Sequence, residues 1–201
     1  MAALEGEVAR RGGTIMNESL VEAVVRLAGF VHAWGRPCAL VGGAAIIARV
    51  QPRLTIDLDL VIVVPAGGSD AVLSLAREHG YDYDEQETRE FIEGGLARLW
   101  GPPGTPDGVG VDLLFVDSPF LESVVVRATP VEIAGTSLPV ASVEDLLLMK
   151  IEADRPHDLD DAIAIKDAFA DQLDRDYVRR WAAALGIKAR IDALLEAKEP
   201  D

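Results

Sequence analysis

The chain has 201 residues and 49% of them are hydrophobic, so it can bury a sizeable core and global disorder is excluded. Its formal net charge of −15 argues against binding to nucleic acid through a basic face, and it suits a metal ion or a basic partner. The single cysteine, Cys38, excludes an intrachain disulfide framework. Apolar runs are of strand length, without a membrane span or a signal peptide, so we expect a cytoplasmic protein with no membrane partner.

The first half of the chain alternates helical and strand patterns after a lead-in at residues 1–16. Leu20, Val24, Leu27 and Val31 recur at steps of three and four residues, which predicts an amphipathic helix over Glu18–Trp34. The same reasoning predicts further helices at 44–50 and 70–80, and apolar strands at 37–41, 57–64 and 109–116.

Two regions of the first half are predicted as short strands. Residues 89–92 and 96–100 are expected to pair through a turn at Gly94-Gly95. Short β-branched runs predict strands at 124–129, 131–133 and 138–140.

From Ser142 onward the pattern becomes helical. Ser142 followed three residues later by Asp145 resembles a capping box, with Asp in place of the usual Glu. Helices are predicted at 143–154, 158–169, 174–185 and 188–197. The change of pattern predicts an α/β core at 17–141 and a helical region at 142–201.

Three aspartates form the first candidate site. Asp57 and Asp59 are two residues apart on a predicted strand, so their side chains share a face, and Asp112 interrupts a later apolar strand. If the two strands are neighbours, the three carboxylates can hold two Mg²⁺ ions, and we predict them as catalytic and metal-binding residues. The alternative is a strand end at which Asp57 and Asp59 pair with Arg53 or Arg98.

Gly42-Gly43 is the second candidate element. A glycine turn at the start of a helix lets backbone amides approach a phosphate, and Arg53 and Thr55 add a charge and a hydroxyl before the aspartates. We therefore predict that these four residues bind nucleotide. The alternatives are an ordinary tight turn between a strand and a helix, and ordinary loop solvation.

Lys150 and Asp158 form the third element, within a segment that also contains Arg155 and Asp161. Lys150 ends an apolar helical run and could neutralise phosphate charge, and Asp158 opens the next helix. Both are predicted as nucleotide-binding residues. A salt-bridge set between two helices on the surface explains the same pattern equally well.

Together these residues resemble the nucleotidyltransferase superfamily of DNA polymerase beta, whose signature is a glycine turn, Asp-x-Asp and a third acid on a later strand. The blocks Arg53-x-Thr55-x-Asp57-x-Asp59, Val111 to Leu114, Ser142 to Lys150 and Arg155 to Asp161 resemble the AbiEii-type toxin nucleotidyltransferases more closely. The resemblance covers about residues 38 to 165.

The resemblance implies an α+β fold, with a mixed β-sheet flanked by helices and a helical C-terminal half. It implies Mg²⁺-dependent transfer of a nucleoside monophosphate from an NTP, with Asp57 and Asp59 on the metal and Asp112 activating the acceptor hydroxyl. By the same likeness Gly42, Gly43 and Lys150 contact the triphosphate. The acceptor can be a tRNA 3′ end, and an antitoxin protein restrains the enzyme.

Two other functions stay open from the sequence. The first is an antibiotic nucleotidyltransferase with a small hydroxylated acceptor, which the acidic charge favours because aminoglycosides are cations. The second is a non-catalytic module that binds nucleotide or protein. The presence of all three acids favours an enzyme.

Overall fold

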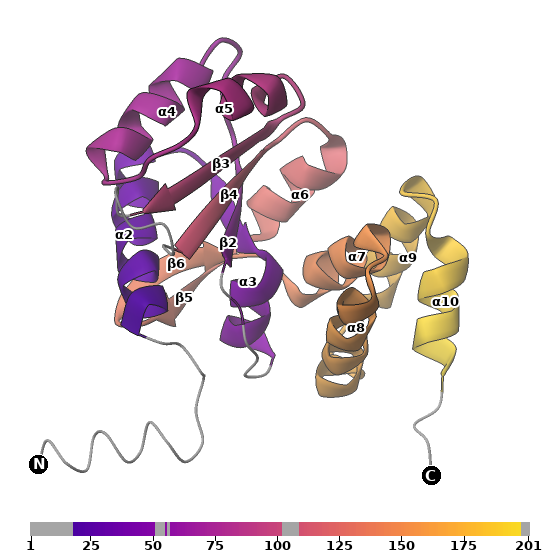
Figure 1. Cartoon of the computed structure of the whole chain (residues 1–201). Helices are drawn as coiled ribbons and strands as arrows, with labels where there is room; N and C mark the ends of the chain where they lie inside the picture. The colour runs from indigo at the N-terminus through magenta and orange to yellow at the C-terminus, as the bar shows by residue number, and fades with distance from the viewer. Residues whose placement is uncertain (1–17, 51–54, 56, 102–108, 198–201) are drawn as a thin grey trace, which may run out of the picture. The chain divides into compact units, whose positions relative to one another are not determined.

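The computed structural model describes residues 18–50, 55, 57–101 and 109–197, and its chain forms two units that divide between Val140 and Ala141. Arg53 lies outside the described residues. The first unit contains a six-stranded mixed sheet in the order β3-β4-β2-β1-β6-β5 (Figure 1). Its strands are β1 (Cys38–Val41), β2 (Asp57–Ile62), β3 (Leu96–Gly101), β4 (Val109–Phe115), β5 (Thr129–Ile133) and β6 (Thr136–Val140).

Two parallel pairings, of β2 with β4 and of β1 with β6, make the sheet mixed. The neighbouring pairs β1–β2, β3–β4 and β5–β6 are antiparallel. Along β2, Leu58 and Leu60 are fully buried, whereas Asp57 is exposed and Asp59 is half-buried. Because side chains alternate between the faces of a strand, this alternation places the two aspartates on one face and the leucines in the core on the other.

Helices accompany the sheet in the first unit, and Figure 1 shows α2 and α6 on opposite sides of it. They are α2 (Glu18–Trp34), α3 (Gly42–Arg49), α4 (Ser69–Glu78), α5 (Glu85–Ile92) and α6 (Pro119–Arg127). The predicted amphipathic stripe of α2 is in the core, since Leu20, Val24 and Leu27 are at most 2% exposed. Cys38 is buried at the start of β1, as its apolar surroundings in the sequence predict.

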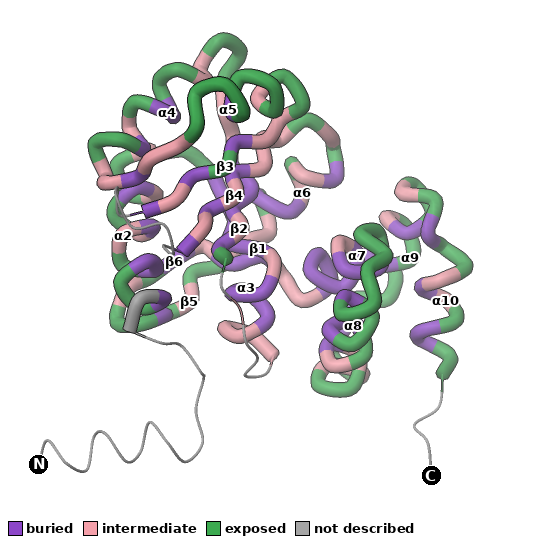
Figure 2. Tube along the Cα trace, viewed as in Figure 1, coloured by how far each residue is buried: buried purple, intermediate pink, exposed green. Residues whose placement is uncertain are grey.

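Two predicted strands are wrong because both segments are helical. Residues 89–92 belong to α5, which contacts β3 and is largely exposed (Figure 2). The N-cap of this helix is Asp84, whose side chain accepts a hydrogen bond from the amide of Glu87. Residues 124–127 belong to α6, whose N-cap Ser118 accepts from the Leu121 amide at 3.3 Å. In both cases a capping side chain sets the helix start, and in α6 this outweighs the β-branched composition of the later turn.

The second unit contains α7 (Val143–Ala153), α8 (Pro156–Phe169), α9 (Arg175–Ala184) and α10 (Lys188–Glu196). Ser142 caps α7 as predicted, since its Oγ accepts from the Asp145 amide and donates to Asp145 Oδ2. Tyr177 on α9 donates its hydroxyl proton to Asp145, which ties α9 to the start of α7.

The predicted fold class is confirmed: an α+β chain with a mixed sheet and a helical C-terminal part. None of the helices that the structure describes has the length and apolar character that crossing a membrane requires.

Candidate active site

The three predicted aspartates lie on neighbouring strands of the first unit. β2 and β4 are parallel, with Asp59 directly opposite Asp112 and Asp57 opposite Gly110. Residues in register on adjacent strands project from the same face, and Asp57 and Asp59 share a face by their spacing. The fold therefore brings the three positions, of which Asp112 is far from the other two in sequence, to one face of the sheet. They lie near the N-terminal end of β2.

Gly42 provides the space that the Asp59 carboxylate occupies. β1 runs antiparallel to β2 with Val41 opposite Asp59, so the chain turns into α3 beside that carboxylate. A Cβ at position 42 would lie 1.9 Å from Asp59 Oδ2, and the φ angle of +64° also favours glycine. Only a glycine can occupy this position without displacing Asp59.

A second glycine has the same relation to Asp57. A Cβ at Gly110 would lie 2.8 Å from Asp57 Oδ1, closer than a carbon atom can approach without a shift. Sequence reasoning missed this residue, because its role depends on the pairing of β2 with β4. Each aspartate of the Asp57-x-Asp59 pair thus lies against a glycine from a neighbouring segment.

The start of α3 lies beside Asp59. Gly42 and the buried Gly43 form its first two positions, and the N-cap residue Val41 makes no side-chain hydrogen bond to it. The first amides of a helix have no partner within the helix, and the helix dipole adds a partial positive charge at this end. Binding of a phosphate at this end of α3 stays a prediction.

Arg98 holds Asp112 in a bidentate ion pair. Arg98 is directly opposite Asp112 on β3, and its Nε and terminal nitrogen donate to the two carboxylate oxygens at 2.7 and 2.6 Å. The hydrogen bond and charge of Asp112 raise the pKa of Arg98, with Asp57 and Glu87 adding to the effect. The alternative expectation paired Arg98 with Asp57 or Asp59, but its hydrogen-bond partner is the third acid.

Binding of Mg²⁺ by the three aspartates stays a prediction. Within the described ranges, no three side chains among His, Cys, Asp and Glu gather as a group that could hold a metal ion. Both oxygens of Asp112 accept from Arg98, which keeps this carboxylate engaged. The donor chemistry nevertheless fits, because Asp57 and Asp59 offer the oxygen ligands that Mg²⁺ prefers, and Gly42 and Gly110 leave space for the two carboxylates themselves.

The other predicted nucleotide-binding residue of this region that the structure describes is Thr55. Its hydroxyl donates to the backbone carbonyl of Asp57 at 3.1 Å, so it supports the start of β2. Contact of Thr55 with a nucleotide stays a prediction.

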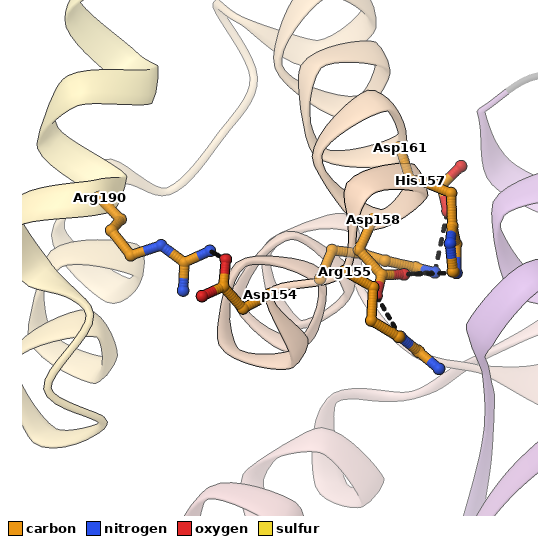
Figure 3. Close-up of polar contacts among 7 residues, drawn as sticks. Asp154, Arg155, His157, Asp158, Asp161 and Arg190 are labelled. Carbon is orange, nitrogen blue, oxygen red and sulfur yellow. Dashed lines mark hydrogen bonds and ion pairs between the residues drawn. The ribbon is translucent and has the colours of Figure 1, made fainter.

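In the second unit, the buried residues Lys150, Asp158 and Asp161 form a charge cluster, and Figure 3 shows Asp158 and Asp161 with the neighbouring Arg155. Lys150 is 6% exposed on α7, and its Nζ contacts Asp158 Oδ1 at 2.7 Å and Asp161 Oδ2 at 2.8 Å, both on α8. Arg155 donates its Nε proton to the second oxygen of Asp158 at 2.6 Å. The salt-bridge alternative anticipated this pairing between two helices but placed it at the surface, whereas Lys150, Asp158 and Asp161 are buried and Arg155 is exposed. The nucleotide contacts of Lys150 and Asp158 stay predictions.

The ionisation of Asp158 follows from its partners. Burial by itself would raise the pKa of this carboxyl, but the hydrogen bonds and charges of Lys150 and Arg155 outweigh that effect. The pKa therefore lies below its ordinary value, and Asp158 is ionised throughout the neutral range. His157 lies at the edge of the cluster, with its Nε2 3.7 Å from Asp158 Oδ1.

Several solved structures resemble this chain in fold. The solution structure of the antibiotic-resistance factor ANT(2″)-Ia matches with a TM-score of 0.55 and 16% identity, over 89% of this chain and 96% of that one. The crystal structure of ANT(2″)-Ia in complex with adenylyl-2″-tobramycin matches with a TM-score of 0.51 and 14% identity, over 85% of this chain and 98% of that one. The crystal structure of JHP933 from Helicobacter pylori matches with a TM-score of 0.52 and 14% identity, over 90% of this chain and 84% of that one. These likenesses show a shared fold.

A comparison with curated proteins found no match. The sequence matches a family described as "Nucleotidyl transferase AbiEii toxin, Type IV TA system" over residues 27–185, which is most of the chain. This range contains all three aspartates, the glycine turn and the Lys150 cluster. The chain therefore belongs to the AbiEii nucleotidyltransferase toxin family, and it is a nucleotidyltransferase.

Proposed function

We propose that this enzyme uses Asp57, Asp59 and Asp112 to transfer a nucleoside monophosphate from an NTP to an acceptor hydroxyl, with Mg²⁺ as cofactor. The observation that carries the proposal is the position of Asp59, which lies against Gly42 at the start of α3 and opposite Asp112 on β4. One carboxylate thus joins the glycine turn, where phosphate would bind, to the third acid.

Each residue has a distinct role in this proposal. The backbone amides of Gly42 and Gly43 bind phosphate oxygens at the positive end of α3, and Arg53 and Thr55 lie on the segment that leads into β2. Asp57 and Asp59 hold the metal. When bound, Mg²⁺ supplies the positive charge that offsets the triphosphate and helps the acceptor to lose its proton. Asp112 accepts that proton as the hydroxyl oxygen attacks the α-phosphorus, and pyrophosphate leaves.

The acceptor that we propose is the 3′ end of a tRNA, in a toxin whose activity an antitoxin protein restrains. The family match to a toxin of a type IV system supports this choice. A small cationic acceptor is the second candidate, because the net charge of −15 would attract an aminoglycoside and repel RNA. The resemblance to ANT(2″)-Ia is one of fold and does not decide between the two.

One transfer assay separates these acceptors. The purified chain is incubated with Mg²⁺ and each of the four NTPs labelled at the α-phosphate, together with total tRNA or with an aminoglycoside mixture. We expect label on tRNA from one preferred nucleotide, and no transfer by Asp57→Ala. Asp70→Ala, which removes an exposed carboxylate on α4, is the matched control and should retain activity. Equal transfer by Asp57→Ala and the native enzyme would exclude the assignment of the site.

A further inference from the structure

Arg98 and Asp112 form a close cation–carboxylate contact on the face that carries the proposed catalytic acids. It joins directly opposed residues of β3 and β4 and uses both oxygens of the carboxylate. The Asp112 side chain is 17% exposed and the Arg98 side chain is 54% exposed. The guanidinium therefore covers the acid from the solvent side and leaves neither oxygen without a donor.

In this state the guanidinium engages one lone pair on each oxygen of Asp112 and offsets its negative charge, so the carboxylate is a weaker ligand for a metal ion and a weaker acceptor for the proton of a hydroxyl. A guanidinium presents its donors as a planar fork that matches both oxygens of a carboxylate, so the pair is stronger than a contact through one oxygen. Arg98 also interacts electrostatically with Asp57, so its positive charge opposes the approach of a second cation to this face.

We propose that Arg98 is a positioning residue that holds Asp112 and competes with divalent metal for it, a role that rests on the proposed function. In the protein without nucleotide, metal binds through Asp57 and Asp59 while Asp112 stays with Arg98. A triphosphate offers the guanidinium other anionic oxygens, so its arrival releases Asp112 for the reaction. The third acid is thereby available only when substrate is present.

A purely structural role for this pair would have a different signature. The Arg98 side chain is half exposed, so its removal leaves no internal cavity, and exposed ion pairs add little to folding stability. Loss of Arg98 should therefore change metal binding much more than it changes the unfolding transition.

The test is direct binding of Mn²⁺ to the full chain without nucleotide, followed through the electron paramagnetic resonance signal of free Mn²⁺. Arg98→Gln should bind Mn²⁺ about tenfold more tightly than the native protein, the effect of losing one charge-assisted pair. The Mn²⁺ affinity of Arg98→Lys should lie between those of Arg98→Gln and the native protein, because lysine keeps the positive charge but cannot donate to both carboxylate oxygens as a guanidinium does. Arg77→Gln is the control, since it removes an arginine from another exposed ion pair, with Glu85 on α5, and should leave the affinity unchanged.

The double variant Arg98→Gln/Asp112→Asn should lose the gain in affinity, and this result would support the competition for Asp112. Equal affinities of Arg98→Gln and the native protein would overturn the role of Arg98 and leave the proposed function standing. A gain in Mn²⁺ affinity that persists in the double variant, which lacks the Asp112 carboxylate, would also overturn the role of Arg98. Failure of both the native protein and Arg98→Gln to bind Mn²⁺, or binding by Asp59→Asn with the native affinity, would overturn both the inference and the proposed metal site.

Discussion

The Asp59 carboxylate lies against the Cα of Gly42, so closely that a Cβ at position 42 would be 1.9 Å from Asp59 Oδ2. This contact links two parts of the signature that are well separated in sequence. It gives the glycine a reason beyond its backbone angle, because the proposed metal ligand occupies the volume of the absent side chain. The contact predicts that a change at Gly42 affects catalysis through Asp59.

Gly42→Ala should lower transfer activity by about a hundredfold or more, because displacement of a catalytic group by about 1 Å has an effect of that size. Its cost in stability should be about 1–2 kcal/mol, mostly from the positive φ angle, since the Asp59 side chain can rotate away. The measurements are urea unfolding and the rate of transfer.

Gly67→Ala is the matched control for this variant. Gly67 has a φ angle of +73°, but a Cβ at this position would meet no atom within 4 Å, so the substitution should cause similar strain and leave activity intact. If both variants keep full activity, the contact of Gly42 with Asp59 does not position the carboxylate.

Lys150→Ala should destabilise the protein by about 3 kcal/mol, because it leaves buried carboxylates of Asp158 and Asp161 without this cation. Lys188→Ala removes a lysine from an exposed pair with Asp192 and should cost less than about 1 kcal/mol. Urea unfolding of both variants, followed by circular dichroism, gives the comparison. Similar midpoints for the two would show that the buried cluster does not stabilise the fold.

Asp158 should contribute to the pH dependence of stability. Its pKa in the folded protein lies below its unfolded value, so its stabilising effect is complete above the unfolded pKa of about 4 and disappears as the pH falls through the folded value. The difference in unfolding free energy between the native protein and Asp158→Asn should therefore be largest near neutral pH and shrink under acid conditions. A difference that stays constant from about pH 7 to about pH 2 would be incompatible with the lowered pKa.

Cys38 should be unreactive in the native protein. It is buried in β1, and burial raises the pKa of its thiol to about 11. At about pH 8 only about one thiol in a thousand is then ionised, and the thiolate is the reactive form. Labelling with a chromogenic disulfide reagent should be slow in buffer and fast in denaturing urea. Rapid labelling in buffer would show that β1 opens readily.

Most of the secondary structure follows from local patterns. The stripe of Leu20, Val24 and Leu27 defines α2, and Ser142 with Asp145 marks the start of α7. The errors occur where local composition and helix capping disagree: the valine run at 124–126 has the composition of a strand, but the capping residue Ser118 and Pro119 start a helix upstream of it. Capping residues are therefore more informative here than the composition of one turn.

The sequence identified the candidate site residues but not the contacts that they make in the fold. The spacing of Asp57 and Asp59 fixes their common face without any knowledge of the fold. The pairing of Asp112 with Arg98, and the space that Gly110 leaves for Asp57, depend on the register of β4 against β3 and β2. Register is set by interactions between distant segments, so one sequence does not reveal it.

The proposed function assigns nucleotide transfer to carboxylates on one face of the sheet that act with a metal ion, and Asp59 is the carboxylate beside both Gly42 and Asp112. The decisive measurement is the rate of Mg²⁺-dependent pyrophosphate release by Asp59→Asn, which keeps the size of the side chain and removes its charge. We expect a loss of about a thousandfold or more with an unchanged unfolding transition, because several kcal/mol of transition-state stabilisation depends on the metal. Release by the folded Asp59→Asn protein at the native rate would show that this carboxylate has no part in catalysis.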